Sequence, residues 1–269
     1  MPIMNMPSAT KPTLAVLGAD GTLGSDLVDF LSVDYEVTGI TRGNYEAFRG
    51  RPFDIFVNAN GNSRRFWANE HPLEDFEAST LSVYKSLFDF KFHKYIYISS
   101  SDVYDDHADP VRAVEDVEID PQSLSSYGLH KFLAELAVRH HAKSWVVLRS
   151  SSILGRHLKK GPLYDILNGR PLFITLDSRL QMITTRAIAD IVNVLASVKR
   201  DGSSGETFNM GGKDAFEFKD IARYFDQPIE IDAKAETQEY EMSVEKLGKI
   251  FPLKTSEEYL KDFINGTKK

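Results

Sequence analysis

The chain has 269 residues, of which 42% are hydrophobic and 26% charged, and its formal net charge is −7. These values are typical of a globular protein that buries a sizeable core in one domain, or in one domain plus a small second lobe. The acidic balance provides no general basic field for nucleic acid or an anionic membrane, and the sequence has no run of about 18 apolar residues that could cross a bilayer.

The absence of cysteine excludes a disulfide and a thiol nucleophile, and it is compatible with a reducing, cytoplasmic location. Residues 1–11 lack the apolar core of a signal peptide, so we expect a frayed leader there. The seven histidines show no zinc-like spacing with acidic residues, so no metal site is expected.

The stretch 13–24, TLAVLGADGTLG, is the organising feature of the sequence. Its apolar run at 13–17 predicts a buried parallel strand, and helix-compatible sequence comes after the glycines. Glycines let the backbone turn sharply beside a bound group, and the next helix N-terminus presents N–H groups to a phosphate. This pattern favours a dinucleotide pyrophosphate cradle over a strand-to-helix turn that binds nothing, and the cradle would comprise Gly18, Gly21, Thr22, Leu23 and Gly24.

Alternating strands and helices continue along the chain. We expect strands at 36–40, 53–57, 94–99, 145–149 and 206–209, and helices at 72–90, 125–140, 161–169, 186–198, 216–225 and 256–264. Only about a dozen residues separate the second and third strands, so the crossover helix between them is shortened or missing. The alternation predicts an α/β fold with a Rossmann-type, doubly wound parallel sheet.

The pattern becomes looser after residue 150. We therefore expect a dinucleotide-binding domain at 12–150 and a smaller substrate-binding lobe at 151–269, with the segment 183–212 returning to the first domain.

Tyr127 and Lys131 lie four residues apart in a helical segment, which places both side chains on one helix face. A free tyrosine has a pKa of about 10, and a nearby ammonium group lowers that pKa by favouring the phenolate. The pair is therefore a candidate proton donor or acceptor, and Ser100 at the end of a strand can supply a hydroxyl to the same substrate oxygen. The alternative is a chance Tyr-x-x-x-Lys on a surface helix.

The three signals occur in a definite order: the glycine turn, then Ser100 with Val103-Tyr104, then Tyr127-x-x-x-Lys131. In motif type, order and spacing the sequence resembles the extended short-chain dehydrogenase/reductase family, the NAD(P)-dependent sugar-nucleotide epimerases, dehydratases and reductases. The resemblance covers most of the chain and includes PLE (72–74), ISSSDVY (98–104), SSYGLHK (125–131), VVLRSSSILG (146–155) and FNMGG (208–212).

The resemblance implies specific roles. Tyr127 would be the catalytic acid/base, Lys131 would lower its pKa and bind the nicotinamide ribose, and Ser100 would be the family's hydroxyl partner. The loop beside the cofactor corresponds to Asn58, Ala59 and Asn60. Relatives dimerise through the helices equivalent to 72–90 and 125–140, so a homodimer is expected.

The end of the second strand predicts the cofactor. NAD-preferring relatives usually carry an acid there, which holds the ribose 2′-hydroxyl. Thr41 and Arg42 occupy this position, and a guanidinium would instead hold a 2′-phosphate. NADP(H) is therefore expected, with NAD(H) possible; the alternative is that Arg42 is a solvated turn residue.

The two residues after Ser100 indicate which type of reaction to expect. Dehydratases of the family carry Asp-Glu there, whereas this chain has Ser101-Asp102, so dehydration is disfavoured. The short segment 43–53 resembles dTDP-4-dehydrorhamnose reductase and related 4-keto-sugar reductases. We therefore expect reduction of a keto group on a nucleotide-linked sugar. Two alternatives remain open: an epimerase with retained NAD, and a non-catalytic dinucleotide-binding regulator.

The candidates on the substrate side are Ser101, Asp102, Ser152 and Arg156. Ser152 stands where the family often has an asparagine that contacts the sugar nucleotide, so a non-sugar ketone or aldehyde also remains possible. Cations at 64–65 and 156–160 could meet a substrate diphosphate, or they could be solvated loop charges. His130 is expected to be a helix-face residue without a catalytic role.

Overall fold

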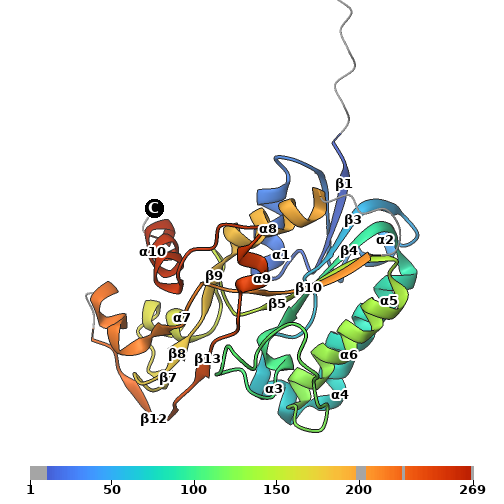
Figure 1. The fold of residues 1–269 in the computed structure, drawn as a ribbon. Helices are drawn as coiled ribbons and strands as arrows, with labels where there is room; N and C mark the ends of the chain where they lie inside the picture. The colour runs from blue at the N-terminus through green and yellow to red at the C-terminus, as the bar shows by residue number, and fades with distance from the viewer. Residues whose placement is uncertain (1–10, 198–203, 226–227, 268–269) are drawn as a thin grey trace, which may run out of the picture.

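The computed structural model describes residues 11–197, 204–225 and 228–267. Its centre is a six-stranded parallel sheet with the strand order β10-β5-β4-β3-β1-β2 (Figure 1). The strands are β1 (Thr13–Leu17), β2 (Glu36–Ile40), β3 (Pro52–Asn58), β4 (Lys91–Ser100), β5 (Ser144–Ser150) and β10 (Ser204–Met210). The predicted Rossmann-type doubly wound sheet is confirmed.

Helices cover both faces of this sheet, as Figure 1 shows. Helices α1 (Thr22–Leu31) and α8 (Thr185–Ser197) lie on one face, and α5 (Ser82–Asp89) and α6 (Ser126–His141) lie on the other. In β1, Leu14 and Val16 pack toward the first helix pair, whereas Ala15 and Leu17 pack toward the second. Because the strand is buried on both faces, its sequence is continuously apolar rather than alternating.

The crossover between β2 and β3 contains only the four-residue helix α2 (Tyr45–Phe48), as the short spacing predicted. The Asn44 side chain orders the turn before it. Its amide oxygen accepts from Thr41 N at 2.7 Å, and its Nδ2 donates to the Gly39 carbonyl at 3.0 Å.

The predicted helix 72–90 is interrupted. It begins as α4 (Pro72–Asp75), passes through a π-helical segment, Phe76–Leu81, and continues as α5. The shorter helix α3 (Arg65–Glu70) precedes it. Such π-helical turns are often found at functional sites, and this one carries the buried Ser79.

The remaining elements form a smaller lobe beside the sheet (Figure 1). Its strands pair as β6 (Ser152–Leu154) with β9 (Met182–Thr184), and β7 (Leu172–Ile174) with β12 (Ile231–Glu236). Strand β8 (Arg179–Leu180) lies between β11 (Phe216–Glu217) and β13 (Glu239–Tyr240). The helices of the lobe are α7 (Pro162–Leu167) and α10 (Ser256–Thr267), whereas α9 (Glu245–Gly248) packs against β10 of the central sheet.

The prediction of a helix over 216–225 is wrong at its start. Phe216 and Glu217 pair with β8, and a 3₁₀ helix, Phe218–Tyr224, comes next. Phe216 is buried in the lobe core beside Phe218, so tertiary packing overrides local helix preference here. The last residue of the predicted helix 186–198 and most of the predicted leader lie outside the described residues. Within the described ranges, no helix is long and apolar enough to span a membrane.

Candidate active site

The glycine turn after β1 brings three backbone segments close together. Gly18 has a φ of +88°, and a Cβ on it would lie 3.0 Å from the Ala59 carbonyl oxygen. A Cβ on Gly24 would lie only 2.0 Å from the Gly18 carbonyl oxygen, so α1 packs against the turn only with glycine there. Gly21 caps α1 without a side chain that could satisfy the first N–H groups. These groups and the close backbone approach fit a dinucleotide pyrophosphate.

The cradle opens into a cavity of about 940 Å³ between the sheet and the smaller lobe. Many of the predicted site residues line it: Gly21, Thr22, Leu23, Ala59, Asn60, Ser100, Ser101, Asp102, Tyr127, Lys131 and Ser152. The carboxyl ends of parallel strands meet at one sheet edge, which is where ligands bind in open α/β folds.

Helix α6 presents Tyr127 and Lys131 to this cavity. Ser125 caps the helix by accepting from Gly128 N at 3.2 Å. A Cβ on Gly128 would lie 2.1 Å from the Asp102 carbonyl oxygen, so glycine there lets the helix start approach the turn after β4. As a result, Ser100 and Tyr127 lie close together at the cavity wall.

The protonation of the pair differs from the prediction. Burial raises the pKa of Tyr127, and the Asp102 carboxylate raises that pKa further. Burial also lowers the pKa of Lys131, to about 8. The expected lowering of the Tyr127 pKa toward neutrality is therefore not found in this arrangement, because the phenol is 7% exposed and faces a carboxylate.

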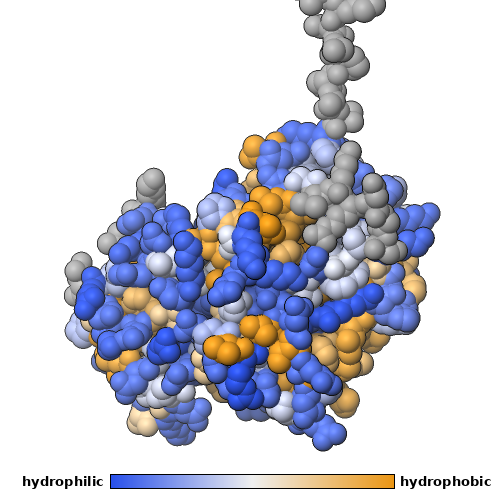
Figure 2. Space-filling view, viewed as in Figure 1, coloured by the Kyte–Doolittle hydropathy of each residue, from blue (hydrophilic) through white to orange (hydrophobic). Residues whose placement is uncertain are grey.

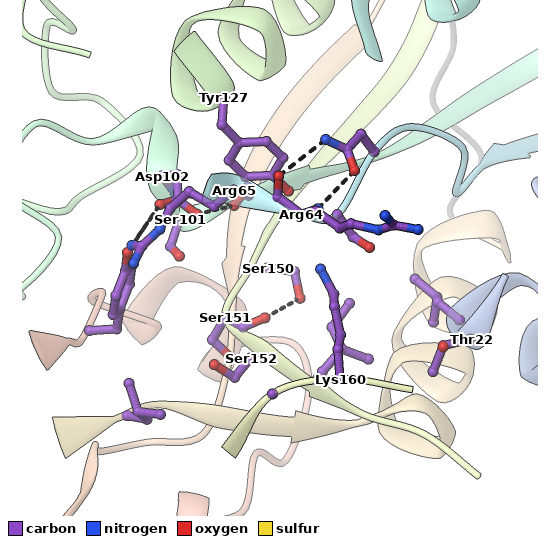
Figure 3. A pocket seen from close by; sticks show the side chains of 18 of the residues that line it. Thr22, Arg64, Arg65, Ser101, Asp102, Tyr127, Ser150, Ser151, Ser152 and Lys160 are labelled. Carbon is purple, nitrogen blue, oxygen red and sulfur yellow. Dashed lines mark hydrogen bonds and ion pairs between the residues drawn. The ribbon is translucent and has the colours of Figure 1, made fainter. Parts of the chain in front are cut away.

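Asp102 connects Ser100 to the smaller lobe. Its Oδ2 accepts from Ser100 Oγ at 3.0 Å, and its Oδ1 accepts from Tyr240 Oη at 3.1 Å. Arg65 Nη1 lies 3.4 Å from the same Oδ1, and the Arg65 guanidinium also lies over the Tyr240 ring. Figure 3 shows Asp102 and Arg65 beside Tyr127 at the cavity wall. Both oxygens of the Asp102 carboxylate therefore interact with side chains of the protein.

A buried polar network supports the wall behind Lys131. His130 Nδ1 lies 2.6 Å from Asp75 Oδ2, and Asp75 Oδ1 accepts from Ser79 Oγ at 3.1 Å and from Asn62 Nδ2 at 2.9 Å. Sequence reasoning missed Asp75 and Asn62. An aspartate on the inner face of a predicted helix was the available signal for Asp75, whereas His130 is the helix-face residue that was expected, buried against a carboxylate.

A second buried cluster lies under the end of β4. Glu135 and Arg149 are almost fully buried and form an ion pair at 2.9 Å. Ser99 Oγ donates to Glu135 at 2.6 Å, and Arg149 Nη1 donates to Tyr104 Oη at 2.8 Å. These bonds fix the strand end that carries Ser100.

Some predicted residues lie elsewhere. Asn58 is fully buried, and its Nδ2 donates to Tyr95 Oη at 2.7 Å, so it shapes the loop rather than lining the cavity. Arg156 does not line the cavity, because its guanidinium pairs with Asp26 at 2.8 Å and Asp29 at 2.7 Å. The substrate role of Arg156 stays a prediction, and the structure places this side chain outside the cavity lining. Four more predicted residues lie outside the cavity lining. Gly18 and Gly24 allow the close backbone approach in the turn, and Thr41 and Arg42 follow the end of β2.

Two cations of the 156–160 run, Lys159 and Lys160, line the cavity, and Figure 3 shows the Lys160 side chain extending into it. Desolvation in the cavity and the Arg64 cation lower its pKa to about 8. The run of basic residues was the correct signal, but it did not distinguish which of them enters the site.

Comparisons with known proteins agree with this geometry. A model of the NAD dependent epimerase/dehydratase family matches residues 14–211. Comparison with curated proteins finds no match. Many solved structures share the fold. One is a UDP-galactose 4-epimerase, with 21% identity, a TM-score of 0.73 and coverage of 94% of this chain and 97% of that chain.

Two further solved structures show that both reductases and epimerases share this fold. A dTDP-4-dehydrorhamnose reductase from Bacillus anthracis in complex with NADP has 14% identity, a TM-score of 0.77 and coverage of 96% and 99%. A UDP-glucuronic acid 4-epimerase from Bacillus cereus in complex with UDP-glucuronic acid and NAD has 19% identity, a TM-score of 0.73 and coverage of 94% and 99%. At these identities the likeness shows the fold. Because the family model matches most of this chain, the chain belongs to the NAD-dependent epimerase/dehydratase family and is an NAD(P)-dependent enzyme of the extended short-chain dehydrogenase/reductase type.

Proposed function

We propose that the protein is an NADPH-dependent oxidoreductase that reduces a keto group on a nucleotide-linked sugar, with Tyr127 as proton donor. The observation that carries the proposal is the convergence of Ser100, Tyr127 and Lys131 with the glycine cradle in one cavity. A nicotinamide held there would supply the hydride for the carbonyl carbon.

The protein's own groups would bind the cofactor and transfer the proton. The N–H groups of the first turn of α1 would bind the pyrophosphate, and Lys131 would hold the ribose. Tyr127 would give its phenolic proton to the carbonyl oxygen, while Ser100 would turn its hydroxyl to the same oxygen as charge develops there. Because burial raises the pKa of Tyr127, the phenol carries its proton at neutral pH, which suits the reductive direction.

The preference for NADP(H) rests on Arg42. This residue is exposed at the end of β2, and among the described residues its guanidinium has no hydrogen bond or ion pair. An unpaired guanidinium at this position suits a ribose 2′-phosphate, for which a carboxylate would be repulsive.

The second candidate function is a sugar-nucleotide epimerase with retained NAD, which the similarity to UDP-sugar 4-epimerases favours. The two functions differ in how tightly the cofactor is held. The deciding experiment is to heat-denature the purified protein and assay the supernatant for nicotinamide cofactors. Near-stoichiometric NAD⁺ supports the epimerase. A protein that releases none, binds NADPH ahead of NADH and oxidises NADPH with a nucleotide-linked keto-sugar supports the reductase.

We also propose a homodimer through α4, α5 and α6. Large apolar side chains remain exposed along these helices and the π-helical segment between α4 and α5: Leu73, Phe76, Tyr84, Phe88 and Leu136. Figure 2 shows apolar surface over this edge of the molecule. Sedimentation equilibrium tests the proposal, and Phe88→Glu is expected to shift a dimer toward monomer.

A further inference from the structure

Lys160 and Arg64 approach the cavity from opposite walls. Arg64 lies in the loop after β3, and Lys160 ends the loop between β6 and α7. Figure 3 shows the Lys160 side chain extending across the cavity toward the wall that carries Arg64. Within the described residues, neither side chain has a hydrogen bond or an ion pair. The proposed proton transfer uses neither of them.

Arg64 stands on an ordered turn. Its backbone N–H donates to Asn62 Oδ1 at 2.9 Å, and Asn62 Nδ2 donates back to the Arg64 carbonyl at 3.2 Å. Asn62 is in turn bound to Asp75 at 2.9 Å and, through its N–H, to Ser79 at 3.2 Å. The buried network therefore holds the Arg64 backbone in place, while the guanidinium projects without a counter-ion.

The Lys160 loop is fastened to the cofactor cradle. Thr22 Oγ1, in the first turn of α1, donates to the His157 carbonyl at 2.9 Å. The Arg156 side chain and backbone N–H both donate to Asp26, at 2.8 Å and 3.0 Å. Asp26 is fully buried and also accepts from Thr185 Oγ1 at 2.6 Å. These contacts hold the loop that carries Lys160 against α1, whose N-terminus favours anions.

The cavity therefore contains two facing cations that repel each other. The Arg64 and Lys131 charges both oppose protonation of Lys160. The Asp102 carboxylate favours it, but that carboxylate already accepts from Ser100 and Tyr240. An anion between Lys160 and Arg64 would relieve this repulsion. A phosphate group suits the gap best, because it offers several acceptor oxygens to donors on two sides.

We infer that Lys160 and Arg64 form a phosphate clamp across the cavity. This inference rests on the proposed binding of a dinucleotide and a nucleotide-linked substrate, and the phosphate belongs to one of those two ligands. The clamp explains why two unpaired cations are held on ordered loops in a protein whose net charge is −7.

Binding measurements without turnover test the clamp. Lys160→Gln and Arg64→Gln are compared with Lys249→Gln, an exposed lysine outside the cavity lining that gives the same change in charge. Dissociation constants are measured separately for NADPH by fluorescence and for UDP and dTDP by calorimetry. We expect each clamp variant, but not the control, to weaken one ligand class about tenfold, and Lys160→Arg to retain most of the affinity. All variants alter exposed side chains, and circular dichroism checks their folding.

The ligand class that weakens identifies the source of the phosphate: NADPH indicates the cofactor, and UDP or dTDP indicates the substrate. Both variants matching Lys249→Gln for every ligand, or a loss in only one of the two, overturns the clamp. A wild-type protein that binds none of these ligands overturns both the clamp and the proposed function. Clamp-dependent binding without reduction of any nucleotide-linked keto-sugar overturns only the proposed function.

Discussion

The Ser100 hydroxyl donates to the Asp102 carboxylate at 3.0 Å, although Ser100 is the group proposed to bind the substrate oxygen. Asp102 Oδ1 is meanwhile held by Tyr240 and Arg65. The carboxylate thus orients Ser100 from one side while anchoring the smaller lobe from the other. We infer that Asp102 is a positioning residue for Ser100 rather than a substrate ligand.

Asp102→Asn is expected to lower kcat and to change the pH profile. If Tyr127 is the proton donor, as proposed, activity requires its protonated form, and the rate falls as pH rises through the pKa of this residue. The Asp102 carboxylate raises that pKa, so removing its charge lowers the pKa and moves the alkaline limb to lower pH. A kcat–pH profile measures the shift. Asp105→Asn, outside the cavity lining, serves as the control; identical profiles for the two variants contradict the assignment.

Tyr127→Phe removes the proposed proton donor while keeping the buried ring. We expect kcat to fall by about 10²–10⁴-fold with NADPH affinity little changed, because the ring packing and the glycine cradle remain. Steady-state kinetics and NADPH fluorescence titration separate the two effects. Tyr164→Phe, on α7 and outside the cavity lining, is the matched control. Near-normal turnover in Tyr127→Phe would remove the proposed role.

Arg42→Asp tests the cofactor preference. If Arg42 holds the 2′-phosphate, the variant should lose about tenfold or more in NADPH affinity and little in NADH affinity, because a carboxylate repels the phosphate. Lys249→Asp makes the same change in net charge away from β2 and controls for the general field. Unchanged NADPH binding means that Arg42 is a solvated turn residue.

Gly24→Ala is expected to destabilise the cradle. The new methyl group would lie 2.0 Å from the Gly18 carbonyl oxygen, so α1 must move away from the turn. NADPH binding should be severely weakened and the thermal midpoint lowered. Gly248→Ala is the control, because a Cβ there meets no atom within 4 Å and alanine favours the helix. A Gly24→Ala protein that binds NADPH normally contradicts this account of the turn.

Arg149→Leu should destabilise the fold strongly. It removes the bidentate partner of the buried Glu135 carboxylate and leaves Arg139, at 2.8 Å, as its remaining cation, so the loss in the free energy of unfolding should approach that of a fully broken buried pair, about 3–5 kcal/mol. Arg112→Leu removes a solvent-exposed ion pair with Asp106 and should cost less than about 1 kcal/mol. Urea unfolding of both variants measures the difference in the free energy of unfolding. Equal decreases in the two variants would show that the buried ion pair stabilises the fold no more than the exposed one.

Much of the fold was predictable because its signals are local. The apolar run before the glycines, the helical spacing over 125–140 and the short crossover after Gly43 each reflect chemistry within a few residues, and the structure confirms the corresponding elements. The segment at Phe216 was not predictable in this way, because its strand depends on a partner, β8, that is distant in sequence.

For the candidate site, too, some features were predictable from the sequence and others depended on tertiary packing. Residue type and spacing along the chain were enough to identify the family, and they predict the glycine cradle and the Ser100–Tyr127–Lys131 set as the candidate site. Three-dimensional packing was needed to establish that Arg156 pairs with Asp26 while Lys160 enters the cavity, and that Tyr127 faces Asp102. Burial and through-space charge set those outcomes, and both depend on neighbours that the order of residues does not specify.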